Sequence, residues 1–163
     1  MDAIECLKTR RSIRQYLADA IDTAILEDIA DCGRMAATAI NIQPIHIVIV
    51  TNAELKAAIA NTTDHGKFMA NAPACVIVLS EDTKYYMEDG CAATQNILLA
   101  AKAHGLGSCW IAGDKKQYAD SIRKMLGAPD GFKLISIIAI GKAAAVPAPA
   151  KKPLKEVLHW DKF

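Results

Sequence analysis

Residues 89–113 read D-G-C-A-A-T-Q-N-I-L-L-A-A-K-A-H-G-L-G-S-C-W-I-A-G. The alanine-rich part predicts a long helix from about Tyr86 to His104 that stops at Gly105, because a residue in the left-handed conformation commonly follows a helix. A short strand over residues 107–111 is expected next. The glycines do not form a dinucleotide-binding fingerprint, since Trp110 stands where the third glycine is needed and the preceding element is a helix.

Helices and strands are predicted to alternate on both sides of this stretch. Asp22 is a favourable N-cap for a helix that runs through Arg34. Residues 61–71 are polar and predict a loop. The further helices are expected over 2–8, 53–60 and 117–126, and the further strands over 45–51, 74–80 and 133–140. Element order alone favours a parallel, doubly wound sheet.

Length and composition limit the class of protein. The chain has 163 residues, of which 52% are hydrophobic, and a net charge of +1. The length and the hydrophobic share suit one domain with a sizeable core. The small net charge gives the molecule as a whole no attraction for nucleic acid or anionic lipid. The apolar runs have the length of strands and are too short to span a membrane. The N-terminus lacks the basic segment followed by an apolar one that marks a signal peptide, so a cytoplasmic location is expected.

The five cysteines and four histidines show no metal-ligand spacing. No C-x-x-C pair occurs, and the odd number of scattered cysteines argues against a disulfide framework. Small buried thiols are the simpler interpretation, also for Cys109 beside Trp110. No metal site is predicted.

The most conspicuous charge cluster is T-R-R-S-I-R-Q-Y at residues 9–16. In an extended segment Arg10, Ser12 and Arg14 would point one way, and Arg11 with Ile13 the other. Guanidinium groups and a hydroxyl at this spacing can converge on a phosphate. The alternative is a solvated basic edge.

Two further segments carry polar groups of interest. N-I-Q-P at residues 41–44 offers amide donors and acceptors that suit a heterocycle, although such residues also end helices. A-K-K-P-L-K-E-V at residues 150–157 is a second basic patch, for which a solvated tail is the alternative.

Taken in order, four segments resemble the nitroreductase family of flavoproteins. They are R-R-S-I-R-Q-Y, A-T-A-I-N-I-Q-P-I, the stretch 89–113, and I-G-K followed by K-K-P-L-K-E-V-L-H. The resemblance implies an α+β fold with a mixed, mainly antiparallel central sheet flanked by helices, in an intertwined homodimer. The whole chain, 1–163, would be one flavin-binding domain. This expectation replaces the parallel sheet that element order favours.

The resemblance also implies which residues bind flavin mononucleotide (FMN). Arg10 would meet the phosphate and Arg14 would lie nearer the pyrimidine edge. The other residues that match the family's basic motifs are Arg11, Ser12, Lys151 and Lys152. A loop from the partner chain would bring Thr38, Asn41 and Gln43 to the flavin. The isoalloxazine ring would lie against Ile111, Ala112 and Gly113.

The implied activity is transfer of a hydride from NADH or NADPH to flavin N5, and onward to a nitroaromatic, quinone or similar small acceptor. The flavin carries the chemistry, so no catalytic side chain is predicted. The segment 80–90 is shorter than the flavin-covering insertion of larger members. A flavin-binding protein with little NAD(P)H turnover is therefore the alternative. A third hypothesis is an anion-binding interaction surface, with nucleic acid as a candidate partner, and the near-neutral net charge disfavours it.

Overall fold

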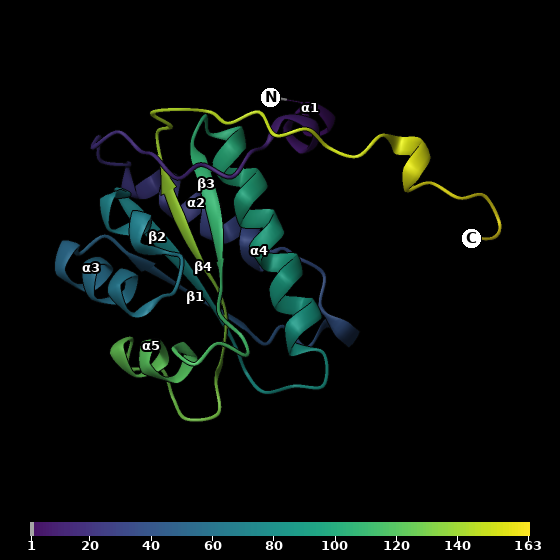
Figure 1. The fold of residues 1–163 in the computed structure, drawn as a ribbon. Coiled ribbons are helices and arrows are strands. Elements are labelled where there is room, and N and C mark those ends of the chain that lie inside the picture. Colours follow the sequence, from purple (N-terminus) through teal and green to yellow (C-terminus); the bar gives the residue numbers. More distant parts are fainter. Residues whose placement is uncertain (1) are drawn as a thin grey trace.

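The structure is a computed structural model that describes residues 2–163. Its four-stranded sheet has the order β1-β2-β4-β3 (Figure 1). The strands are β1 (Ile45–Val50), β2 (Ala74–Ser80), β3 (Gly107–Ala112) and β4 (Lys133–Gly141). All three strand pairings are antiparallel, and one isolated parallel bridge joins Ser12 to Ser108. The α+β fold is confirmed, whereas the parallel sheet is wrong, because element order does not specify strand direction.

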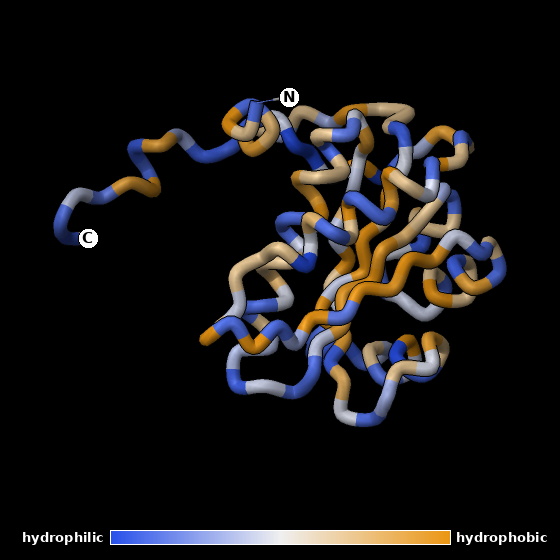
Figure 2. Tube along the Cα trace, turned by 180° about the vertical axis from the view of Figure 1, so that it is seen from behind, coloured by the Kyte–Doolittle hydropathy of each residue, from blue (hydrophilic) through white to orange (hydrophobic). Residues whose placement is uncertain are grey.

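Helices cover both faces of the sheet. The helices are α1 (Ala3–Thr9), α2 (Thr23–Arg34), α3 (Ala53–Thr62), α4 (Tyr86–Ala103) and α5 (Ala119–Met125). One core cluster joins the sheet to α2 and α4, and the other joins it to α3 and α5. The central strands β2 and β4 are therefore buried on both faces, which explains their continuous apolar sequences (Figure 2).

The helix ends follow the predicted local chemistry. The Asp22 carboxylate accepts a hydrogen bond of 2.9 Å from the Ala24 amide and begins α2. Gly105 has a φ of 75° directly after His104, the C-cap of α4. A side chain at this position would strain the backbone, so the predicted stop at Gly105 is confirmed.

The segment 61–71 differs from the predicted loop. Helix α3 continues to Thr62, and a short 3-10 helix, η2, spans Lys67–Asn71. Met69 is fully buried and Phe68 packs against the same core cluster. These two apolar side chains tie a mostly polar segment to the core, and they bring its preceding residues towards β3.

The chain ends in an extended arm. Tyr16 pairs with Ala143, and the chain then runs past residues 10–14, where Pro147, Pro149 and Lys151 line a cavity. Beyond this point the arm leaves the body and contains the short helix η3 (Leu154–Glu156) (Figure 1). Its apolar side chains Leu154, Val157 and Trp160 are exposed. Within residues 2–163, no helix combines the length and the hydropathy that crossing a membrane requires.

Candidate functional site

The segment after α1 is held against the edge of the sheet. The Ile13 amide donates to the Ser108 carbonyl at 2.9 Å, and Ser12 forms a β-bridge with Ser108, the second residue of β3. Ile13 is buried against Gly107, where a Cβ would lie 2.5 Å from the Ile13 Cγ1 atom. Gly107 therefore lets the segment approach β3 closely, and the side chains beside Ile13 are fixed at the surface.

A cationic cavity of about 360 Å³ opens beside this segment. Its lining combines basic side chains with one hydroxyl and two prolines: Arg10, Arg11, Ser12, Arg14, Pro147, Pro149 and Lys151. No carboxylate lines it, and within residues 2–163 none of its four basic side chains forms an ion pair. The cavity is thus a local concentration of positive charge in a nearly neutral chain.

Two details of this cavity differ from the sequence expectation. Arg11 lines it together with Arg10, although simple alternation sends the Arg11 side chain to the opposite side. One Arg11 Nη1 atom donates to the carbonyls of Lys8 and Arg10, both at 2.9 Å, so the side chain folds back along its own backbone. Lys151 reaches the cavity, whereas the exposed Lys152 is not among its lining residues.

A second, aromatic cavity of about 170 Å³ shares Arg14 with the first. The Arg14 guanidinium carbon lies 6.0 Å from the centre of the Phe68 ring, within the range of a cation–π contact. The other lining residues come from the segment before η2, from β3 and from the turn after it: Asp64, His65, Cys109, Trp110, Ile111, Ala112, Lys116 and Tyr118. A polar end and an aromatic end therefore meet at one arginine.

The walls of the aromatic cavity are mostly uncharged. Burial raises the pKa of the Cys109 thiol, although the nearby Arg14 and Arg10 oppose this effect. Burial also raises the pKa of Tyr118, whose hydroxyl donates to the Ala112 carbonyl. Lys116 Nζ lies 3.6 Å from Asp64 Oδ2. Cys109 and Tyr118 are therefore uncharged at neutral pH. The Lys, Arg, Asp and Glu side chains of the lining are Arg14 and the pair Lys116 and Asp64.

The residues predicted to face a ring are only partly brought together. Ile111 and Ala112 line the aromatic cavity, and Gly113 does not. The Gly113 amide donates to the Ile135 carbonyl at 3.0 Å, and a Cβ on Gly113 would lie 2.6 Å from the Leu134 carbonyl oxygen. Gly113 therefore has a clear packing reason of its own, the close approach of the chain to β4.

Thr38, Asn41 and Gln43 lie at a different part of the molecule. They belong to the loop around η1 (Ala39–Asn41), whose Ala39 amide donates a hydrogen bond to Asp89 in the first turn of α4. They line neither cavity. Arg10 lies near the other end of α4, where it shares a small cavity with Lys102 of the last turn. An 18-residue helix is about 27 Å long, so one chain does not join this loop to the cationic cavity.

Sequence reasoning missed the aromatic-cavity residues from 64–68 and 116–118. The available signal was the pair Phe68 and Met69 inside an otherwise polar segment, because two adjacent large apolar side chains need a core to pack against. The sequence did not indicate Tyr118, because it lies in a predicted helix and no neighbouring residue suggests what its ring contacts.

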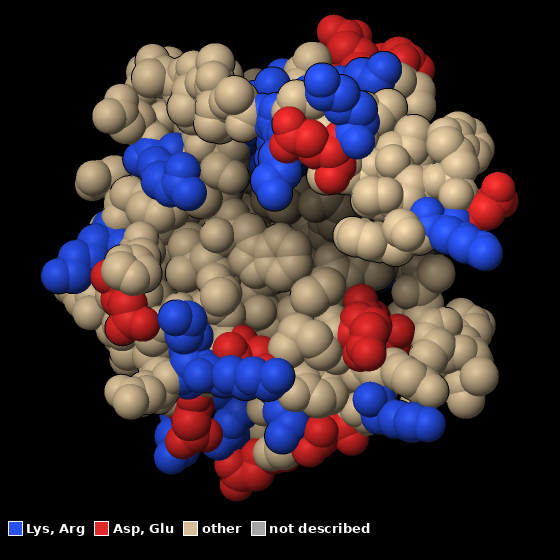
Figure 3. Space-filling view, turned by 45° about the vertical axis from the view of Figure 1, so that its right-hand side comes forward, with Lys and Arg blue, Asp and Glu red and all other residues tan. Residues whose placement is uncertain are grey.

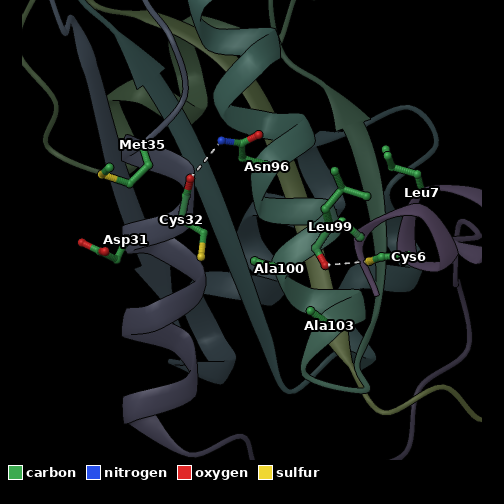
Figure 4. A pocket seen from close by; sticks show the side chains of 10 residues that line it. Cys6, Leu7, Asp31, Cys32, Met35, Asn96, Leu99, Ala100 and Ala103 are labelled. Atoms are coloured by element: carbon green, nitrogen blue, oxygen red, sulfur yellow. Dashed lines mark hydrogen bonds between the residues drawn. The ribbon is translucent and has the colours of Figure 1, made fainter. Parts of the chain in front are cut away.

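An apolar groove of about 470 Å³ lies between α1, α2 and α4. Cys6 and Leu7 of α1 face Cys32 of α2 and its C-cap residue Met35 across the surface of α4 (Figure 4). The Asn96 side-chain amide donates to the Cys32 carbonyl at 3.1 Å and joins α4 to α2. The space-filling view towards the α4 side shows a hollowed, uncharged surface bordered by charged side chains (Figure 3).

Comparison with known proteins identifies the family. The model of the family described as “Putative TM nitroreductase” matches residues 2–163. A protein of Archaeoglobus fulgidus, named “Putative NADH dehydrogenase/NAD(P)H nitroreductase”, is 33% identical over 147 residues, which are 84% of each chain.

Solved structures agree with this match. An FMN-dependent nitroreductase from Clostridium difficile is 26% identical with a TM-score of 0.90, and the match covers 98% of this chain and 99% of that one. A structure from Desulfovibrio desulfuricans, described as “a putative nitroreductase in complex with fmn”, is 26% identical with a TM-score of 0.88 and coverage of 100% and 98%. The chain therefore belongs to the nitroreductase family.

Proposed function

We propose that this protein is an FMN-dependent oxidoreductase that takes a hydride from NADH or NADPH and passes reducing equivalents to a nitroaromatic, quinone or similar small acceptor. The single observation that carries the proposal is the pair of cavities that meet at Arg14, one cationic and one aromatic. Relatives named FMN reductase (NADPH) and NADPH-flavin oxidoreductase support the same assignment.

The residues present fit FMN. Arg10, Arg11, Ser12 and Lys151 offer charge-assisted donors to a phosphate, and no carboxylate lining the cavity competes with it. The aromatic cavity offers apolar walls to a flat ring, with Arg14 as a positive charge at its polar edge. When bound, the flavin would supply the redox chemistry.

The protein's own contribution is binding, orientation and exclusion of water. Ile111 and Tyr118 are buried walls, so a ring that lies against them is shielded from solvent on that side. The Cys109 thiol stays protonated at neutral pH because burial raises its pKa. We therefore assign Cys109 to the wall and not to a thiol redox step.

A homodimer completes the proposed site. Asn41 and Gln43 are exposed amides that lie away from both cavities of their own chain, so we assign them, with Thr38, to the flavin of a second copy. The apolar groove between α1, α2 and α4 and the exposed apolar side chains of the C-terminal arm supply surface that a second copy would bury. We also propose Gly113 and Lys152 as flavin contacts. Neither residue lines either cavity of the single chain, so these contacts would form only in the dimer with the cofactor bound.

We extend the proposal to the whole chain, 1–163, as a single flavin-binding domain that acts in the cytoplasm. The two core clusters share one sheet, which supports a single domain. All five cysteines are free, which suits a reducing compartment.

A flavin-binding protein with little turnover is the second candidate. Strand β2 ends at Ser80 and α4 begins at Tyr86, with Tyr85 as its N-cap, so the short link between them holds no helix that could cover a flavin. NAD(P)H oxidation with an added quinone separates the two candidates, because only the oxidoreductase sustains turnover.

Titration of FMN into the purified protein tests the proposal. Arg10→Ala is expected to weaken binding by about ten- to a hundredfold, because a hydrogen bond to a charged group contributes about 1.5–3 kcal/mol. Lys124→Ala, which removes an exposed positive charge of α5 paired with Asp120, is the matched control and is expected to bind FMN normally. Equal FMN affinity of Arg10→Ala and the unmodified protein would contradict the assignment of Arg10.

A further inference from the structure

The loop between α2 and β1 has an unusual backbone. Ile40, Asn41 and Gln43 have φ values of 47°, 56° and 54°, all in the left-handed region. The left-handed conformation costs roughly 1–2 kcal/mol for a residue with a side chain, and a β-branched residue such as Ile40 seldom adopts it. Ile40 is also 96% exposed, so packing of its own side chain does not repay this cost.

Side chains hold the loop in this conformation at both ends. The Ala39 amide donates to Asp89 Oδ1 at 3.0 Å, across 50 positions of the sequence. The Gln43 amide donates to Thr38 Oγ1 at 3.1 Å. Two backbone bonds of 3.1 Å, from Asn41 to Thr38 and from Ile42 to Ala39, complete the turn. Asp89 supplies the long-range contact among these, and it ties the loop to α4.

Asp89 stands on a rigid support. It lies in the first turn of α4 and is only 4% exposed. Its neighbour Gly90 packs so closely on β4 that a Cβ would lie 2.6 Å from Ile135 Cγ1. One turn further, Thr94 Oγ1 lies 2.7 Å from Ser136 Oγ of β4. The position of Asp89 relative to the sheet is therefore fixed on both sides.

The second oxygen of this carboxylate, Asp89 Oδ2, is buried and has no hydrogen-bond partner within residues 2–163. No cation is paired with Asp89 among the ion pairs of that part of the chain. A buried carboxylate with one bond is a costly way to stabilise a fold, since its desolvation is only partly repaid. The contact that Asp89 does make is the one to the strained loop.

We propose that Asp89 is a positioning residue that fixes the left-handed loop Thr38–Gln43, so that Asn41 and Gln43 are presented to the flavin of the second copy. The inference rests on the proposed function for the last step, since the flavin contact belongs to that proposal. The loop conformation and its dependence on Asp89 stand on this chain alone.

Amide hydrogen exchange of a peptide that spans residues 36–44 tests the proposal without FMN. In Asp89→Ala the exchange of this segment is expected to accelerate about tenfold or more, because a charge-assisted bond to the Ala39 amide is lost. Asp89→Asn is the matched control: its amide oxygen can accept the same bond, so exchange is expected to stay within about threefold of the unmodified protein.

FMN binding and turnover provide the second readout. Asp89→Ala is expected to raise the Kd for FMN by about tenfold with a smaller change in Asp89→Asn, in line with the loop exchange. Unchanged exchange of segment 36–44 in Asp89→Ala would overturn the proposal, and so would faster exchange with unchanged FMN affinity and unchanged kcat/KM. Failure of the unmodified protein to bind FMN would instead contradict the proposed function, while the exchange data would still report on the loop.

A second variant guards against misfolding of Asp89→Ala. Ala39→Pro removes the amide hydrogen that bonds to Asp89 and leaves Asp89 itself unchanged. Thr38 already has the extended backbone (φ −126°, ψ 153°) that a residue before proline favours. It is expected to show the same loss of FMN affinity as Asp89→Ala. Normal FMN affinity in a folded Ala39→Pro protein would overturn the proposal.

Discussion

The Arg14 guanidinium carbon lies 6.0 Å from the centre of the Phe68 ring, at the point where the cationic and aromatic cavities meet. Arg14 follows a β-bridge to β3, whereas Phe68 belongs to η2, so the contact closes the site between two distant segments. Such a contact is attractive and favours this placement of the arginine.

Loss of the Phe68 ring is expected to weaken FMN binding. In Phe68→Leu the affinity should fall by about three- to tenfold, because an aromatic contact is lost while an apolar side chain remains. Phe132→Leu is the control: Phe132 packs against the same core cluster and against His46, and it lines neither cavity. Fluorescence titration with FMN measures both, and equal losses in the two variants would contradict a specific role of Phe68.

The packing of α2 on α4 depends on Gly33. A Cβ at this position would lie 2.7 Å from Ile97 Cγ1, which is closer than real Cβ contacts allow. Gly33→Ala is therefore expected to lower the free energy of unfolding by about 1–3 kcal/mol. Urea denaturation measures the change.

A double-mutant cycle checks that Ile97 is the cause. Ile97→Ala alone is expected to cost about 2–5 kcal/mol, because Ile97 is fully buried. In that background Gly33→Ala should cost clearly less, since the two nearest atoms, both of Ile97, are gone and only Ile47 Cδ1, at 3.0 Å, remains close. An undiminished cost of Gly33→Ala in the Ile97→Ala background would show that another contact is responsible.

The buried hydroxyl pair between α4 and β4 is a second stability determinant. Thr94 Oγ1 lies 2.7 Å from Ser136 Oγ, and Thr94 also donates to the Gly90 carbonyl at 2.7 Å. Thr94→Val leaves the Ser136 hydroxyl without this partner and is expected to cost about 1–3 kcal/mol. The double variant Thr94→Val/Ser136→Ala should recover part of this loss in urea denaturation, and a further loss would contradict the account.

Stability at alkaline pH is expected to depend on Cys75. Burial raises the pKa of this thiol from 9.0 to about 12, an effect that nearby Lys56 partly opposes. As the pH rises, the thiol therefore loses its proton first in the unfolded chain. The contribution of Cys75 to the free energy of unfolding is fully present below pH 9 and decreases as the pH rises from 9 towards 12.

Comparison of urea midpoints at pH 8 and pH 10 measures this effect. Cys75→Ala is expected to be less stable than the unmodified protein at pH 8 and to lose less stability on going to pH 10. The same loss between the two pH values in both proteins would show that Cys75 does not contribute. Cys109, whose pKa burial also raises, is present in both proteins and cancels in the comparison.

Much of the fold could be predicted from local patterns. The Asp22 cap, the stop at Gly105 and the apolar run of β2 each follow from chemistry within a few residues, and the structure confirms them. The direction of the strands could not be predicted in this way, because it depends on which strands pair across the sheet. Only the resemblance of the ordered motifs to a known family supplied it.

The sequence motifs predicted more of the cationic cavity's lining than of the aromatic cavity's, where of the predicted residues only Arg14, Ile111 and Ala112 are found. Arg10, Ser12 and Arg14 stand together in sequence, whereas His65 and Phe68 join them through the burial of Met69. The predicted direction of the Arg11 side chain was wrong, because its hydrogen bonds to the carbonyls of Lys8 and Arg10 override strand alternation. Asp89 was missed for a similar reason, since its partner at Ala39 lies 50 positions away.

The central claim is that this chain holds FMN and that NADH or NADPH reduces it. The most direct measurement is the visible absorbance spectrum of the purified protein after addition of FMN and desalting, followed by anaerobic addition of each nicotinamide. A retained two-banded flavin spectrum that one or both nucleotides bleach is the predicted result. A colourless protein after desalting, or a flavin spectrum that neither nucleotide changes, would contradict the claim.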